Sequence, residues 1–221
     1  KNVLPIWIDD TNQFPINSGS LNYVYSSHCF EHLEDSIINH LLKESFRVLR
    51  KGGFLQIIVP DVEEAISCYK KNDWTFVKKY WQNKNNIGRI ENFYINGNQI
   101  NLATLTASII CGSSNLHERL SNLGYSCTPW AEEKELHKVL MKGDIKEISD
   151  FLNSLIKPGQ QFYEHINVFP KETFEEKLKS FGFELITVKN IDDFIITKKI
   201  IPYFNKWESI SFNFFAQKPY S

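Results

Sequence analysis

The strongest constraint on the fold is a strand–helix–strand pattern. The segment NYVYSS (22–27) is rich in residues that favour strands, and EDSIINHLLKESFRVLR (34–50) repeats its apolar residues at helical spacing. The helix is expected to end at Gly52-Gly53, and FLQIIVP (54–60) then predicts a buried strand. Two strands joined through a helix lie parallel in one sheet, in a right-handed crossover. The chain is therefore predicted to have an α/β fold.

The same sheet is expected to continue at both ends of the chain. VLPIWI (3–8) predicts a short strand, and the stretch after it is rich in the Asn, Pro, Gly and Ser of loops. PKETFEEKLKSFGFELITV (170–188) predicts a helix, a glycine stop and a strand, and SISFNFFAQK (209–218) alternates as a further strand. These segments predict one core made of residues 1–61 and 160–221.

Residues 62–159 show a different pattern, which predicts a mostly helical insertion into that core. Amphipathic segments alternate there with polar stretches such as WQNKNNIGR. The amphipathic segments lie at 62–71, 74–82, 130–141 and 144–156. No apolar run in the chain approaches the roughly 18 residues of a membrane helix.

Charge and cysteine content narrow the choice of partners and compartment. The 25 Lys and Arg residues nearly balance the 26 Asp and Glu residues, so no broad field draws in nucleic acid or an anionic membrane. Lysines and aromatic residues interleave over residues 69–81, which an amphipathic helix with an aromatic core face explains better than a nucleic-acid platform does. The four cysteines form no C-x-x-C pair, which favours reduced thiols. We expect a cytoplasmic protein with neither nucleic acid nor membrane as partner.

Three polar segments follow predicted strands, at the sheet edge where open α/β sheets bind ligands. They are Asp9-Asp10 after the first strand, Ser26-Ser27-His28 after the second, and Asp61 after the third. His165, which precedes the late helix, is expected near the same edge. Asp61 or His165 could remove a proton from a hydroxyl or an amine. These residues are the predicted site.

Two long segments carry a family resemblance. WIDDTNQFPINSGSLNYVYSSHCFEHL (7–33) and RVLRKGGFLQIIVPD (47–61) together resemble class I S-adenosylmethionine-dependent methyltransferases, notably those that modify small molecules and glycans. A weaker resemblance to the same family is found in HINVFPKETFEEKLKSFGFELI (165–186). The resemblance implies a Rossmann-like sheet, partial at its N-terminus, with S-adenosylmethionine as cofactor. The implied acceptor is a small molecule or a glycan. Residues 62–159 lie outside the resemblance, and we predict that they serve as a substrate cap.

The resemblance also implies roles for single residues. Asp10, beside Asp9, stands where the family usually has an acidic residue that contacts the adenine amino group. Ser26, Ser27 and His28 follow the strand that borders the methionine end of the cofactor. Glu31-His32 and Arg47 match family signatures whose implied role is structural, tying helix to strand end by polar contacts.

Each candidate also has a structural explanation. Asp10 could begin an Asx-type turn, His28 could be a solvated residue at a strand end, Asp61 could cap a helix that begins near Val62, and His165 could cap a backbone group. The chain as a whole has an alternative too: a non-catalytic domain of the same fold that binds a partner through its insertion.

The family's glycine-rich cofactor loop and its ribose-binding acidic residue are expected before Lys1, and neither motif occurs in the sequence. Either the sequence is a piece of a longer polypeptide, or the protein is a degenerate relative that does not hold the cofactor normally.

A competing motif is present at His28-Cys29-Phe30-Glu31-His32. It spells H-x-x-E-H, the inverted zinc-protease signature, in which two histidines one helical turn apart bind zinc. That chemistry needs the motif inside a helix, whereas here it overlaps the end of a β-rich run, and the predicted helix begins only near Asp35. We therefore expect no metal site.

Overall fold

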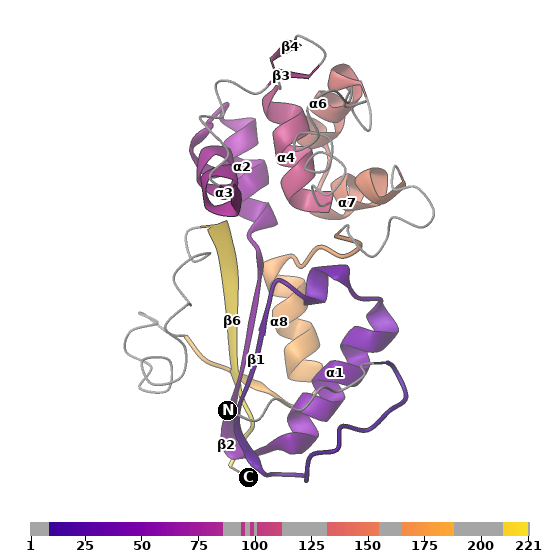
Figure 1. The fold of residues 1–221 in the computed structure, drawn as a ribbon, viewed down its shortest axis with the longest axis vertical. Helices are drawn as coiled ribbons and strands as arrows, with labels where there is room; N and C mark the ends of the chain where they lie inside the picture. The colour runs from indigo at the N-terminus through magenta and orange to yellow at the C-terminus, as the bar shows by residue number, and fades with distance from the viewer. Residues whose placement is uncertain are drawn as a thin grey trace. The chain divides into compact units, whose positions relative to one another are not determined.

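The computed structural model describes residues 9–85, 94–95, 98–99, 101–111, 132–154, 165–187 and 210–220. The chain divides into two compact units (Figure 1). The sheet unit consists of Lys1–Val59, Lys171–Tyr203 and Asn213–Ser221, and the helical unit of Pro60–Pro170 and Phe204–Phe212. The strand predicted at 3–8 lies outside the described residues.

The predicted strand–helix–strand pattern is confirmed in the sheet unit. Strand β1 (Leu21–Ser27), helix α1 (Asp35–Val48) and strand β2 (Leu49–Pro60) follow one another, and β1 pairs in parallel with β2. The sheet has the strand order β1-β2-β6-β5, in which β5 (Glu184–Leu185) runs antiparallel to β6 (Ser211–Gln217). The sheet is therefore mixed, with a parallel pair at β1–β2 and an antiparallel pair at β5–β6.

Helix α8 (Lys171–Ser180) joins the sheet to α1. Its Phe174 ring meets Phe30 at a centroid distance of 6.3 Å and Phe214 of β6 at 4.7 Å, both edge to face. Lys177 donates to the Asp35 carboxylate at the start of α1, at 2.9 Å. The predicted helix, glycine stop and strand are confirmed here, because Gly182, with a φ of 89°, separates α8 from β5.

A polar chain crosses the middle of the sheet. The Tyr23 hydroxyl of β1 donates to the Gln56 side chain of β2, whose Nε2 donates to Asn213 Oδ1 of β6 at 3.0 Å. Gln56 is fully buried, so both ends of its amide need these partners. Burial also raises the pKa of Tyr23, which keeps its hydroxyl protonated as a donor. The three strands are thus linked by side chains as well as by the backbone.

The end of α1 was predicted wrongly. The helix ends at Val48, and a lysine from the far end of the chain satisfies its last carbonyls: Lys218 Nζ donates to Phe46 O at 2.7 Å and to Leu49 O at 2.8 Å. A cation at a helix C-terminus also complements the helix dipole. Local sequence could not show this contact, because the lysine lies about 170 positions away.

Gly52-Gly53 therefore does not stop the helix but shapes the start of β2. Gly52 has a φ of 72°, and the β1–β2 register is irregular just there, between Leu21 and Tyr23 of β1. The Gly52 amide donates to Lys218 O at 2.8 Å. A Cβ atom on Gly52 would lie 2.4 Å from the Tyr220 ring. The glycine provides a left-handed kink and a close approach, both of which other residues resist.

The helical unit contains all four of the amphipathic helices that the sequence predicted. They are α2 (Val62–Lys70), α3 (Thr75–Asn85), α6 (Glu133–Lys142) and α7 (Ile145–Ser154). Figure 1 shows them gathered around α4 (Leu102–Cys111), which the sequence analysis missed. Every residue from Leu102 to Ile110 is buried. A helix buried on all sides carries no amphipathic period, so the pattern used to find the other four was absent.

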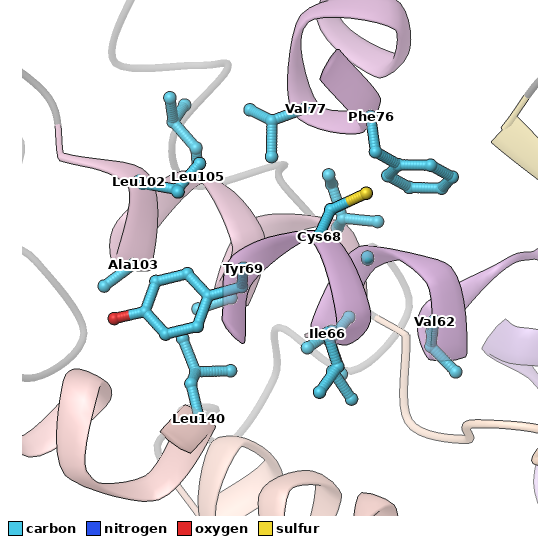
Figure 2. Close-up of a cluster of buried hydrophobic side chains, with 14 of the residues drawn as sticks. Val62, Ile66, Cys68, Tyr69, Phe76, Val77, Leu102, Ala103, Leu105 and Leu140 are labelled. Carbon is cyan, nitrogen blue, oxygen red and sulfur yellow. The ribbon is translucent and has the colours of Figure 1, made fainter. Parts of the chain in front are cut away.

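The core of this unit is apolar and continuous around α4. Helix α4 contacts α2, α3, α6 and α7, and Figure 2 shows labelled side chains of α2, α3, α4 and α6 converging. The short hairpin β3 (Tyr94–Ile95) and β4 (Asn98–Gln99) was not predicted either. No helix in the described ranges is long and apolar enough to cross a bilayer. The extent of the insertion, 62–159, stays a prediction.

Candidate functional site

The two neighbouring aspartates in the loop before β1, Asp9 and Asp10, have different surroundings. The Asp9 carboxylate accepts hydrogen bonds from the backbone amides of Thr11 at 2.8 Å and Asn12 at 2.6 Å. These hydrogen bonds, that of Asn12 first, hold the pKa of Asp9 below its ordinary value. The Asx-type turn therefore falls on Asp9. Asp10 is exposed, and its carboxylate makes no hydrogen bond or ion pair within the part of the chain that the structure describes.

A charged pair on α1 holds the same loop in place, and we call it the Glu44–Arg47 clamp. Arg47 donates from Nε and Nη2 to the two Glu44 oxygens, at 2.9 and 2.7 Å. It also donates to Phe14 O at 3.0 Å and to Ile16 O at 2.8 Å. The Phe14 amide in turn donates to Glu44 Oε2 at 2.7 Å. Hydrogen bonds from Arg47 lower the pKa of Glu44, so the carboxylate stays charged.

The clamp confirms a structural role for Arg47, but Arg47 contacts a different part of the chain from the one expected. The resemblance implied a contact from helix to strand end, whereas Arg47 fixes the loop between Phe14 and Ser18. Glu44 was missed because a glutamate on a helix usually faces solvent. Its position three residues before Arg47 was the available signal, since residues at that spacing are neighbours on a helix.

A second contact from α1 fixes the beginning of the loop. His40 Nε2 lies 2.9 Å from Asn12 O, and the His40 ring meets Phe14 edge to face at 6.3 Å. Together with the clamp, this contact anchors the loop on both sides of Gln13. Asp10 therefore lies two residues before a loop segment that hydrogen bonds from α1 hold in place.

The end of β1 carries the second group of predicted residues. Ser26 and Ser27 are half-buried and pair with β2 up to Ser27↔Ile58. The pairing continues one residue further, because the His28 amide donates to Ile58 O at 2.9 Å. His28 itself has a φ of 48°, a left-handed conformation that histidine adopts rarely. Such residues occur mainly where the surrounding structure imposes them, often at functional sites.

His28 is paired with a buried carboxylate. Its Nδ1 lies 3.2 Å from Glu31 Oε1, with side-chain exposures of 23% for His28 and 2% for Glu31. This contact confirms that Glu31 links the turn η1 (Phe30–His32) to the strand end. The buried Glu31 carboxylate is therefore close enough to the His28 ring to orient it.

Cys29 and the H-x-x-E-H signature lie at the same strand end. Burial first, and then the Glu31 charge, raise the pKa of the Cys29 thiol, so Cys29 is a poor nucleophile at neutral pH. The H-x-x-E-H signature does not lie on an α-helix, since η1 is a single 3-10 turn and His28 precedes it. The spacing that brings both histidines of an inverted zinc protease onto one helix face is therefore not met.

The two predicted catalytic residues belong to the helical unit, where each has a structural partner. Asp61 caps α2, because its Oδ1 accepts from the Glu64 amide at 3.0 Å. His165 is buried, and its Nδ1 lies 3.0 Å from Ile109 O in α4. Both structural explanations from the sequence are thus found. A catalytic role for either residue stays a prediction.

Comparison with known proteins gives one match. Residues 3–57 match the model of a family described as a methyltransferase domain. The match covers β1, η1, α1 and β2 up to Ile57, and with them Asp10, His28 and the Glu44–Arg47 clamp. Neither a curated protein nor a solved structure matches the chain. The helical unit lies outside the match.

Proposed function

We propose that the chain takes part in methyl transfer from S-adenosylmethionine, because residues 3–57 match the model of a methyltransferase domain. The observation that carries the proposal is the exposed Asp10 carboxylate on a loop fixed by α1. The loop and the end of β1 both fall within the matched residues. A sheet unit of Rossmann-like type uses this kind of edge to bind its ligand.

The residues present fit the cofactor's adenosine end. An exposed carboxylate such as Asp10 can accept a hydrogen bond from the adenine amino group. The Glu44–Arg47 clamp keeps the loop ordered before binding, so little conformational entropy is lost when the ligand arrives. Ser26, Ser27 and His28 are the residues we assign to the other end of the cofactor. Asp9 serves the site indirectly, through the turn that it stabilises.

In the proposed reaction, the cofactor and the protein supply different groups. S-adenosylmethionine, when bound, supplies an electrophilic methyl group. The protein aligns the acceptor and removes its proton where the acceptor is a hydroxyl or an amine. We assign that proton to His28, whose ring lies beside the buried Glu31 carboxylate. Asp61 and His165 are the other residues that we propose as proton acceptors. We further propose that the helical unit serves as a cap for the methyl acceptor, a small or sugar-like molecule.

Titration calorimetry with S-adenosylmethionine and with S-adenosylhomocysteine tests the proposal, on the present chain and on any longer native form. Binding of either compound supports it. Loss of the Asp10 hydrogen bond in Asp10→Ala should then weaken binding by about 1–3 kcal/mol. Asp150→Ala removes another exposed carboxylate, from α7, and serves as the control, with no expected change in cofactor affinity.

Failure of both compounds to bind any form of the protein would contradict the enzyme proposal. The alternative would then stand: a non-catalytic domain of methyltransferase fold that binds a partner. An affinity unchanged by Asp10→Ala would remove that residue from the site while leaving the rest of the proposal intact.

A further inference from the structure

The helical unit contains a cavity of about 600 Å³ that the methyltransferase match does not cover. Its lining comes from α2, the turn after α2, the beginning of α4, and α6. This volume is typical of sites for small organic ligands. The cavity opens to solvent on a unit whose core is otherwise closely packed.

The inner wall of the cavity is aromatic and apolar. Tyr69, Leu102 and Ala103 are buried at its base, and Trp74 packs partly buried against the same core. Figure 2 shows the Tyr69 ring extending from α2 away from Cys68, with its hydroxyl at the outer end. Trp74 thus offers an aromatic surface to a ligand with a flat C–H face.

Two side chains of the wall hold each other in place. The Tyr69 hydroxyl lies 2.8 Å from His137 Nδ1, and the two rings meet edge to face at 6.0 Å. This hydrogen bond spans α2 and α6 and fixes both polar groups before any ligand binds. A site whose polar groups are already positioned loses less entropy on binding.

The two asparagines of the lining occupy defined places in the backbone. Asn72 has a φ of 54°, and its backbone N–H donates to Tyr69 O at 2.9 Å, which closes the turn after α2. Asn101 caps α4 by accepting from the Thr104 amide at 2.8 Å through Oδ1. Its NH₂ group therefore remains a donor for a ligand.

The charges of the described lining residues balance. Among them, Lys70 is the one lysine and Glu133 the one carboxylate, and both are exposed. A phosphate or a polycation would need an excess of one sign, whereas amides, a phenol, an imidazole and one charge of each sign suit hydroxyl groups. We propose that this cavity binds an uncharged saccharide, whose C–H face contacts Trp74 and whose hydroxyl edge meets Asn72, Asn101 and Glu133.

Binding of the sugar does not depend on the cofactor. The part of the inference that makes this sugar the methyl acceptor rests on the proposed function. The two can therefore be tested apart, because saccharide binding is measured without S-adenosylmethionine and cofactor binding without saccharide.

Saturation-transfer NMR on the full chain tests the inference with stated probes. The neutral probes are maltose, cellobiose, lactose and N,N′-diacetylchitobiose, and the charged probes are glucose 6-phosphate and glucosamine. We expect transfer to ring C–H protons of at least one neutral disaccharide, and weaker transfer to both charged sugars. No transfer to any neutral probe, or transfer only to a charged one, would overturn the inference whether or not the cofactor binds.

Variants locate the binding in this cavity. Asn72→Gly removes the amide but tolerates the positive φ, so folding is preserved, and we expect at least tenfold weaker binding. Trp74→Ala should abolish binding, and Trp74→Phe, which keeps most of the packing, should retain part of it. Lys70→Gln and Glu133→Gln should each change affinity less than fivefold, because the ligand carries no charge. Lys146→Ala on α7 is the control outside the cavity. Unchanged affinity in both Asn72→Gly and Trp74→Ala would overturn the assignment.

Discussion

The two units of the molecule use their side chains in opposite ways. In the sheet unit, charged and polar side chains from distant positions hold backbone in place: the Glu44–Arg47 clamp fixes the loop of Asp10, and Lys218 ends α1. In the helical unit, an apolar helix, α4, is buried by its neighbours on every side. Specific polar contacts demand specific residues, whereas an apolar core demands only volume and pattern. The family match lies wholly within the sheet unit, at residues 3–57.

The largest expected effect is loss of packing at α4. Leu105 is 1% exposed, so Leu105→Ala should lower the free energy of unfolding by about 2–5 kcal/mol through lost burial and a residual cavity. Lys146→Ala, which breaks only an exposed ion pair on α7, should change it by less than about 0.5 kcal/mol. Chemical denaturation measures both. A loss below about 1 kcal/mol for Leu105→Ala would contradict the central position of α4.

The clamp should be the next most costly to break. Arg47→Ala leaves the Glu44 side chain, 5% exposed, without its counter-charge and frees two loop carbonyls, at an expected cost of about 2–3 kcal/mol. Arg47→Lys keeps the charge but loses the fork of donors and should recover less than half of that cost. Equal stability of Arg47→Lys and the unmodified protein would show that charge alone matters.

Asp10→Ala is expected to weaken cofactor binding by a free energy similar to the stability lost in Arg47→Ala. The Asp10 substitution should not change the free energy of unfolding. Asp10 is exposed, so Asp10→Ala should leave the unfolding free energy within about 0.5 kcal/mol of the parent value. A parallel denaturation and calorimetry experiment separates the two effects. A clear loss of stability would mean that Asp10, like Asp9, serves the loop itself.

A smaller effect is expected at Gly52. Alanine at a φ of 72° should cost about 1 kcal/mol. The clash with Tyr220 adds little, because that residue is 74% exposed and its ring can move away. Thermal unfolding of Gly52→Ala with and without Tyr220→Ala checks this reasoning. Full rescue by the second substitution would show that the ring contact, and not the backbone, requires glycine.

The smallest expected effect is the pH dependence of the clamp. Hydrogen bonding from Arg47 lowers the pKa of Glu44 below its ordinary value of 4.5. Its contribution to stability is therefore complete above pH 4.5 and is lost as the pH falls through the lowered value. The stability advantage of the parent protein over Glu44→Gln should thus persist at neutral pH and vanish in acid. A constant difference from pH 3 to pH 7 would contradict it.

Local pattern predicted much of the fold and less of the site. The strand-forming run of β1, the helical period of α1 and the buried run of β2 were sufficient to predict that β1 and β2 pair in parallel. The end of α1 was not predictable, because Lys218 decides it from the opposite end of the chain. Near the site, the sequence placed Asp9 and Asp10 together, and only the geometry shows that Asp9 serves the turn. Glu31, the partner of His28, lies only three residues away in the sequence, but the burial of Glu31 could be known only from the fold.

Photocrosslinking tests the central claim most directly. Ultraviolet irradiation with S-adenosylmethionine labelled in its methyl group, followed by peptide mapping, shows where the cofactor lies. We expect the label on peptides that contain residues 9–28, and loss of labelling when unlabelled S-adenosylhomocysteine competes. Labelling confined to α2, α4, α6 or α7, or no competable label at all, would contradict a cofactor site on the sheet unit.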